Sequence, residues 1–147
     1  MKFLAHIPFV EHLGFELLEM EAGHARIAVE LKPELTNHWD VAHGGLLMTL
    51  LDVAMAHAAR APLVAGGEPF PGVVTIEMKT SFMRPGLSRL VAHGQLLTRT
   101  ATMAFTEGRI LDPEGVLVSH ATGTFKYMRG LPTGPDGRRI TRIDGTD

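Results

Sequence analysis

The chain of 147 residues contains no cysteine, one tryptophan and one tyrosine, and its net charge is only −2. Without cysteine it cannot form disulfides, thiolate metal sites or a cysteine nucleophile. The charge balance gives no excess of positive charge to attract nucleic acid or an anionic membrane surface. We therefore expect neither nucleic acid nor a membrane among its partners. The absence of disulfides is compatible with a reducing compartment, and we expect a cytoplasmic protein.

The start of the chain also lacks a continuous apolar segment, because His6 and Pro8 interrupt it, so no signal region is predicted. The one long apolar run, residues 45–61, is shorter than a membrane span and holds Asp52 and His57, so we do not expect it to cross a membrane. Hydrophobic residues make up 45% of the chain and charged residues 20%, which is ordinary for one soluble globular domain.

Residues 45–61 are nearly all leucine, methionine, alanine and valine, and this length and composition favour a helix over a strand. Apolar residues on every side predict a buried core helix. Two features are unusual for such a helix: it begins with His43-Gly44-Gly45, and Asp52 lies in its middle. Burying an unpaired carboxylate costs several kcal/mol. Asp52 therefore either bonds a neighbouring hydroxyl one turn earlier or has a function.

His43 and Asp52 are nine residues apart, which on a straight helix corresponds to about 13.5 Å and roughly 180° of rotation. The two side chains cannot meet within one chain. If they share a site, a second copy of the helix must supply one of them, most simply across a two-fold axis.

The remaining sequence favours strands. A short helix is expected within residues 3–13, with Phe9 and Leu13 packing inward, and the core helix is expected to stop near Pro62. One helix on an antiparallel sheet predicts an α+β fold, with a domain over residues 1–129 and a disordered tail over residues 130–147. The expected strands are a hairpin of residues 15–20 and 24–31, then a meander of residues 73–83, 90–98, 102–111 and 116–127.

This order, together with Asn37, His43-Gly44-Gly45 and Asp52, resembles the hotdog-fold acyl-CoA thioesterases of the PaaI-like, phenylacetate-pathway branch. The resemblance covers about residues 13–128 and includes the strand that carries Thr75. It implies a hotdog fold, in which an antiparallel β-sheet wraps around one long central helix. It also implies dimers with one continuous sheet, usually paired again as tetramers, a site between the two helices of a dimer, and no cofactor.

The activity implied is hydrolysis of an acyl- or aryl-CoA thioester to the free acid and CoA. A helix start offers free N–H groups and a positive dipole end, so the Gly44 N–H, aided by Gly45, is the expected donor to the oxyanion. Asp52 of the partner helix would be the general base or the nucleophile, and the sequence does not choose between them. His43 is expected to orient the thioester or the loop.

Two further polar residues match the resemblance. Asn37 corresponds to a residue that positions the water or the helix entry, although a loop asparagine can equally be a turn residue. Thr75 corresponds to a hydroxyl residue that holds the water, although threonine is also common in strands for packing reasons. Simple alternation places Thr75 on the same face as Glu77 and Lys79.

The sequence indicates the substrate-binding residues less specifically than the catalytic ones. Arg84 is the leading candidate for the CoA phosphates, because these need cations. Trp39 and Met48 are candidates to line the acyl pocket. The chain departs from the resembled pattern at Asp40, where many relatives have glycine, and at Thr100-Ala101, where relatives often have glycine and a basic residue.

Two other functions stay open. Asp52 and His57 match the Asp-x-x-x-x-His spacing of hotdog-fold enoyl-CoA hydratases, and a non-catalytic acyl-CoA-binding domain would share the same fold. No histidine pair has the helical spacing of a zinc motif, so we expect no metal.

Overall fold

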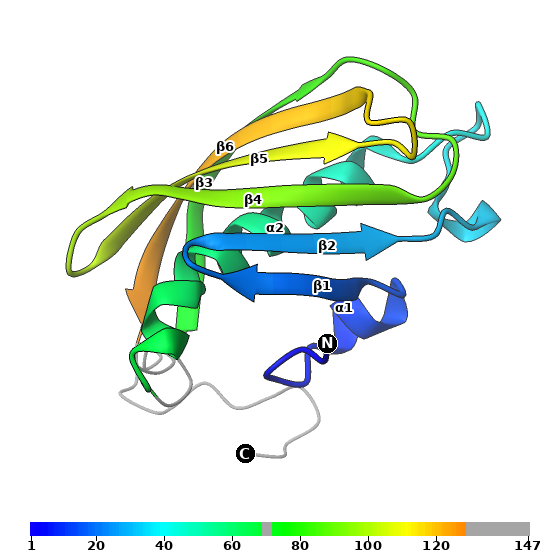
Figure 1. The fold of residues 1–147 in the computed structure, drawn as a ribbon. Helices are drawn as coiled ribbons and strands as arrows, with labels where there is room; N and C mark the ends of the chain where they lie inside the picture. The colour runs from blue at the N-terminus through cyan, green and yellow to red at the C-terminus, as the bar shows by residue number, and fades with distance from the viewer. Residues whose placement is uncertain (69–71, 129–147) are drawn as a thin grey trace, which may run out of the picture.

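The computed structural model describes residues 1–68 and 72–128 (Figure 1). The predicted tail, residues 130–147, lies outside the described residues. The elements, in chain order, are α1 (Pro8–His12), β1 (Glu16–Glu21), β2 (His24–Val29), a 3-10 turn (Pro33–Leu35), α2 (Gly44–Ala65), β3 (Gly72–Phe82), β4 (Leu90–Arg99), β5 (Met103–Leu111) and β6 (Leu117–Met128).

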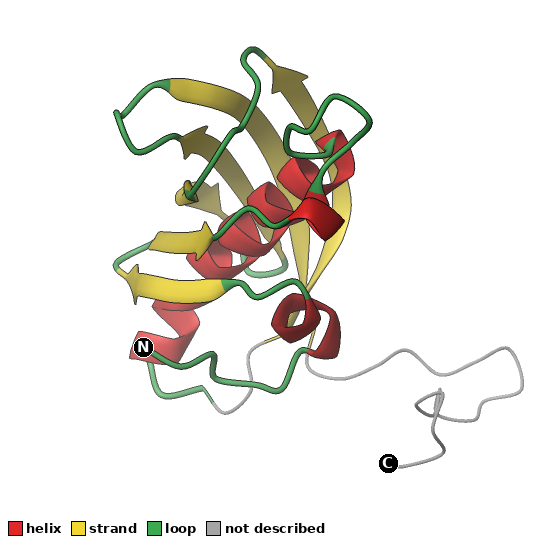
Figure 2. Cartoon of the chain, turned by 90° about the vertical axis from the view of Figure 1, so that its right-hand side faces the viewer, coloured by secondary structure: helices red, strands yellow, loops and turns green. Residues whose placement is uncertain are grey.

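The six strands form one antiparallel sheet in the order β1-β2-β4-β5-β6-β3, which wraps around α2 (Figures 1 and 2). The expected α+β fold with one long central helix is confirmed. The prediction of a simple meander was wrong for β3, which crosses to the far edge and pairs with β6 instead of β4. The crossover makes β3 an edge strand of 11 residues.

The core forms between α2 and the inner face of the sheet. Eleven residues of α2 are buried, and a half-exposed stripe on the helix includes Met48, Asp52 and Ala56. The helix does not stop at Pro62 as predicted but continues to Ala65. The proline ring removes only one N–H donor, and the Pro62 carbonyl still accepts a hydrogen bond from Gly66 N at 3.0 Å.

The helix α2 has 22 residues and is longer than the apolar run of residues 45–61 expected from the sequence. By length and composition alone it could cross a membrane. Its apolar character has another explanation in this fold, because 56% of its most hydrophobic window is buried inside the molecule. The helix packs in the core of the protein, and the sheet wraps around it.

Two expectations at the N-terminus differ from the structure. The helix is only five residues long, Pro8–His12, and Phe9 points outward with 59% of its surface exposed. Val10 is the residue that packs into the core, with 3% exposure. A five-residue helix has too few turns for a periodic pattern to identify its inner face.

Glycines on the inner face of the sheet allow α2 to approach closely. A Cβ atom at Gly94 of β4 would lie 2.3 Å from the backbone oxygen of Ala54. A Cβ atom at its cross-strand neighbour, Gly108 of β5, would lie 3.1 Å from the side chains of Leu51 and Met55. Gly123 of β6 faces the same Met55 side chain. The helix therefore rests in a shallow trough of three strands that only glycine can form.

We expect Gly94→Ala to destabilise the protein by about 3 kcal/mol, because the added methyl meets helix backbone that cannot move aside as a flexible side chain can. Chemical denaturation with a circular-dichroism readout measures the change. Gly115→Ala is a useful comparison, since Gly115 lies in open space but has φ of +79°, so its cost is one of backbone strain alone. Equal losses in the two variants would contradict the close-packing argument.

Candidate functional site

Asp52 lies on the half-exposed stripe of α2, where it faces the N-terminal half of β3. The Thr75 hydroxyl donates a hydrogen bond of 2.7 Å to Asp52 Oδ1. Partial burial raises the pKa of the Asp52 carboxyl above its usual 3.8, and the Thr75 hydrogen bond lowers it in part. A carboxylate with a raised pKa beside a hydroxyl group is suited to accept a proton from water.

Thr75 reaches Asp52 because β3 contains a bulge. Thr75 pairs with Phe125 of β6, but Glu77 pairs with the very next residue, Thr124, so Ile76 has no partner. The extra residue reverses the alternation of side chains along the strand. Thr75 consequently faces α2 whereas Glu77 faces outward, where it accepts a hydrogen bond of 2.8 Å from the Thr124 hydroxyl. The predicted shared face for Thr75 and Glu77 was therefore wrong.

We expect Thr75→Val to shift the acid limb of the pH–activity profile to higher pH. The hydroxyl group lowers the pKa of Asp52, so its removal raises that pKa and leaves less ionised Asp52 at any pH on the limb. A pH series of kcat/KM measures the limb, and Thr75→Ser, which retains the hydroxyl, is the control. An unchanged limb in the valine variant would contradict the coupling between the two residues.

The N-terminus of α2 is capped by its own His43. The Gly45 N–H donates to His43 Nδ1 at 2.9 Å, which leaves the proton of the neutral ring on Nε2. Within the described residues, no hydrogen bond engages the Gly44 N–H, and the Phe82 ring lies near this glycine. Of the two predicted backbone donors, Gly44 is therefore the one that remains open.

The loop before α2 is held by Asn37, whose side-chain oxygen accepts a hydrogen bond of 2.9 Å from Trp39 N. This is the turn role that the sequence left open for Asn37. Asp40 has φ of +58°, in the left-handed region that favours glycine, which accounts for the glycine found there in resembled sequences. Trp39 is 73% exposed and its ring lies against His38.

A cavity of about 340 Å³ opens beside Asp52. No sequence pattern indicated that the N-terminal segment would contribute to it, because that contact depends on tertiary packing. The helical period of 3.6 could have identified Ala56 and Arg60, which follow Asp52 one and two turns later. The lining includes Ile7, Val10, Val53, Ala56 and Val73, with His57 and Arg60 as polar members.

His57 is not arranged as a partner of Asp52. Its Nδ1 lies 2.8 Å from the Val53 carbonyl oxygen, to which it donates, and its ring is 2% exposed against Phe3. Burial lowers the pKa of His57 to about 4, with a smaller contribution from Arg60, against the hydrogen bond to the Val53 carbonyl, which raises it. A neutral imidazole already engaged with backbone does not support the Asp52–His57 pair of a hydratase.

One chain alone does not bring the predicted site together. The structure joins Asp52 to Thr75, but α2 is continuous between Gly44 and Asp52, so these residues lie about 12 Å apart along its axis. Met48 lies on the same half-exposed stripe as Asp52. Arg84 follows β3, where its guanidinium donates to the Leu117 carbonyl at 3.2 Å.

Known proteins show the same fold. A family model described as the thioesterase superfamily matches residues 40–119. The chain is 27% identical over 140 residues to the medium/long-chain acyl-CoA thioesterase YigI of Escherichia coli strain K12, across 87% of this chain and 89% of that one. The PaaI protein of the E. coli phenylacetic acid degradation operon aligns with a TM-score of 0.74 at 22% identity, across 83% and 85% of the chains.

A mutant of the phenylacetic acid degradation protein PaaI from Thermus thermophilus aligns with a TM-score of 0.71 at 28% identity, across 82% of this chain and 98% of that one. The predicted hotdog architecture and the resemblance to PaaI-like proteins are thus confirmed.

Proposed function

Because the chain belongs to the thioesterase superfamily, we propose that it hydrolyses acyl-CoA thioesters at a site shared by two copies of the chain. Asp52 of one subunit acts on the carbonyl group, and the Gly44 N–H of the other subunit stabilises the oxyanion. The observation that carries this proposal is the Asp52–Thr75 pair, in which a half-buried carboxylate with a raised pKa lies on the half-exposed stripe of α2 beside the edge strand β3.

The chemistry needs one proton acceptor and one oxyanion donor. As a general base, Asp52 removes a proton from water while the oxygen attacks the thioester carbon. The carbonyl oxygen becomes negative and accepts a hydrogen bond from Gly44 N–H, strengthened by the helix dipole. The C–S bond then breaks, and the CoA sulfur leaves with the proton. As a nucleophile, Asp52 would form an anhydride that water hydrolyses.

Two surfaces support a second copy of the chain in this role. Among residues 1–68 and 72–128, no strand pairs with the outer side of the edge strand β3, and its outward Val74 and Ile76 are 41% and 53% exposed. Exposed apolar edge strands are unfavourable unless another strand covers them. The neighbouring stripe of α2, which includes Met48, Asp52 and Ala56, is half-exposed as well. A two-fold axis beside both surfaces would bring the start of one α2 to the middle of the other.

The acyl group would enter the 340 Å³ cavity beside Asp52, whose lining is mainly apolar. Fully burying an apolar chain there favours binding by roughly 0.8 kcal/mol for each methylene group. YigI is named for medium and long acyl chains, and we propose the same aliphatic preference for this chain. Arg84 remains the candidate for the CoA phosphates. Trp39 and Met48 are not among the residues that line this cavity in one chain, and we propose that they line the part of the acyl pocket that the second copy completes.

Hydrolysis of a series of CoA thioesters, with free thiol as the readout, tests the proposal. We expect thiol release that increases from acetyl-CoA to a medium-chain thioester, and no hydration of an enoyl-CoA. Binding of the same thioesters without thiol release would favour the acyl-CoA-binding domain instead, and it would refute the hydrolase proposal.

A further inference from the structure

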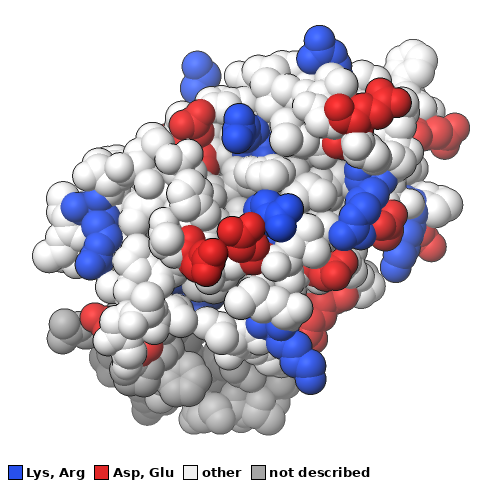
Figure 3. Space-filling model, in the orientation of Figure 1, with Lys and Arg blue, Asp and Glu red and all other residues white. Residues whose placement is uncertain are grey.

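The outer face of the sheet, on the side away from α2, carries a row of basic side chains. Arg26 of β2 pairs directly with His93 of β4, and His93 pairs directly with Arg109 of β5. Arg109 in turn pairs with His120 of β6. The sheet lies in front of α2 in Figure 1, so this face is turned to the viewer in Figure 3, where charged side chains of both signs lie among uncharged ones.

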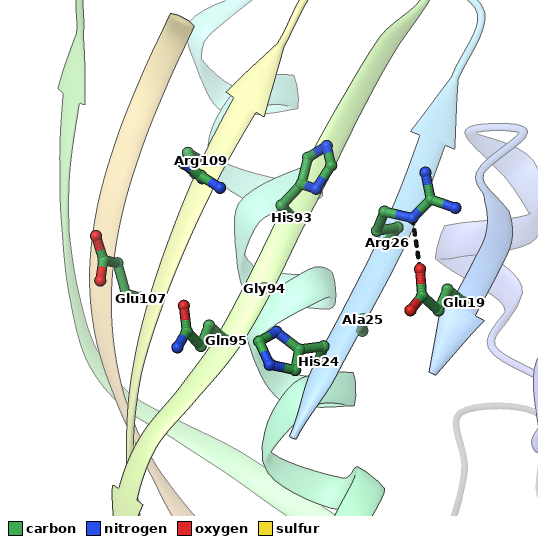
Figure 4. Close-up of a pocket in the computed structure, with 9 residues that line it drawn as sticks. All are labelled: Glu19, His24, Ala25, Arg26, His93, Gly94, Gln95, Glu107 and Arg109. Carbon is green, nitrogen blue, oxygen red and sulfur yellow. Dashed lines mark hydrogen bonds and ion pairs between the residues drawn. The ribbon is translucent and has the colours of Figure 1, made fainter. Parts of the chain in front are cut away.

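Three members of this row, Arg26, His93 and Arg109, line a cavity of about 320 Å³ (Figure 4). Two carboxylates also line it, and both are engaged. Glu19 Oε2 accepts a hydrogen bond of 2.7 Å from Arg26 Nε, and Glu107 Oε1 lies 2.9 Å from His120 Nε2. The terminal nitrogens of Arg26 are not used by the Glu19 contact, so they can donate elsewhere.

Arg109 has no such partner. No ion pair joins it to a carboxylate anywhere in residues 1–68 and 72–128. Arg26 and Arg109 lie on either side of His93, and the pKa of His93 reflects this arrangement: burial lowers it most, Arg109 and Arg26 lower it further, and Glu19 raises it. A negative ligand between the two arginines would offset their positive charge.

We propose that this cavity binds a small phosphate-type oxyanion between the guanidinium groups of Arg26 and Arg109, above His93. One strand separates β2 from β5, so the two arginines start about 9.6 Å apart. Figure 4 shows the Arg26 side chain turned toward Glu19. Arginine side chains are long, so two of them starting from strands this far apart can both reach a tetrahedral anion above His93, each through an N–H···O bond of about 2.8 Å. His24 and Gln95, which pair across β2 and β4, provide further donors at the rim.

The proposed anion site is separate from the thioesterase site. Thr75 and Asp52 lie on the inner side of the sheet, whereas the row of Arg26, His93 and Arg109 lies on the outer side. The anion could be inorganic phosphate or the phosphate group of a monoester, since both present the same oxygens. The inference does not rest on the proposed hydrolysis, and either could fail alone.

NMR titration of the histidine imidazoles in the full chain tests the proposal, with inorganic phosphate and glycerol phosphate as separate probes and chloride used to hold the ionic strength constant. We expect phosphate to raise the pKa of His93 in a saturable manner, because a bound anion favours the imidazolium form. A response to inorganic phosphate alone would identify the free ion, and a response to both probes would identify a phosphate-monoester site.

Arg109→Gln should weaken phosphate binding roughly tenfold, since it removes one charge-assisted hydrogen-bond partner. It should also raise the pKa of His93 without phosphate, because a positive neighbour is lost. Lys126→Gln is the matched control, an exposed cation on the outer face of β6 removed with the same change in net charge. No saturable response of His93, or equal weakening in both variants, would overturn the proposal.

Discussion

Replacing Asp52 with asparagine is expected to lower the turnover of acyl-CoA by at least about a hundredfold, the scale typical of a general acid–base group. Asparagine keeps the shape of the side chain, and its carbonyl oxygen can still accept the Thr75 hydrogen bond. It cannot accept a proton from water or attack the carbonyl carbon. Steady-state thiol release under saturating substrate measures the effect, and full activity would refute the role of Asp52.

The stability of the same variant provides the control. Burial raises the pKa of Asp52, so the ionised form is less favourable in the folded protein than in the unfolded chain, and at neutral pH the carboxylate opposes folding. The asparagine variant should consequently be as stable as the parent protein or more stable. A variant that is inactive and also unstable would point to misfolding, and not to loss of the base.

Replacing Gly44 with proline should lower turnover by about 100- to 1000-fold, because it removes the N–H proposed to bind the oxyanion. The fold should tolerate the change. Gly44 is the first residue of α2, a position that proline favours, and His43 before it has φ −61° and ψ +137°, which a following proline accepts. Thiol release is again the measurement, with circular dichroism to verify the helix.

Gly44→Ala is the matched control, because it keeps the N–H and its Cβ would make only an ordinary contact of 3.6 Å with the Phe82 ring. We expect it to remain active. Mixing the proline variant with Asp52→Asn should restore part of the activity, since a mixed dimer contains one site with both groups intact. Equal losses in the proline and alanine variants would contradict the oxyanion role, and failure of mixing would contradict the shared site.

Local signals in the sequence were sufficient to predict the core of this fold. The apolar run of α2 is long enough to distinguish helix from strand, and a single Asp52 within it identified the candidate site. The half-turn offset of His43 and Asp52 followed from helix geometry alone. Each of these inferences depends only on residues that are close together in the chain.

The features that the sequence did not reveal all depend on pairing between distant segments. The position of β3 beside β6 cannot be read from an alternating pattern, which would suit either neighbour. The row of Arg26, His93 and Arg109 exists only because of the register of three strands. The wall that Ile7 and Val10 add to the cavity likewise depends on where α1 docks.

The unpaired Ile76 gives β3 two different halves. Before this residue, the strand turns Thr75 toward the carboxylate, and after it Met78 and Thr80 face the interior in the opposite phase. Deleting Ile76 would make the Thr75–Phe125 and Glu77–Thr124 pairs consecutive, so both halves would keep their faces and the strand would lose only the bend that the bulge gives it. Inserting a second residue there would instead turn Thr75 away from the carboxylate while the half after Ile76 kept its pairing with β6.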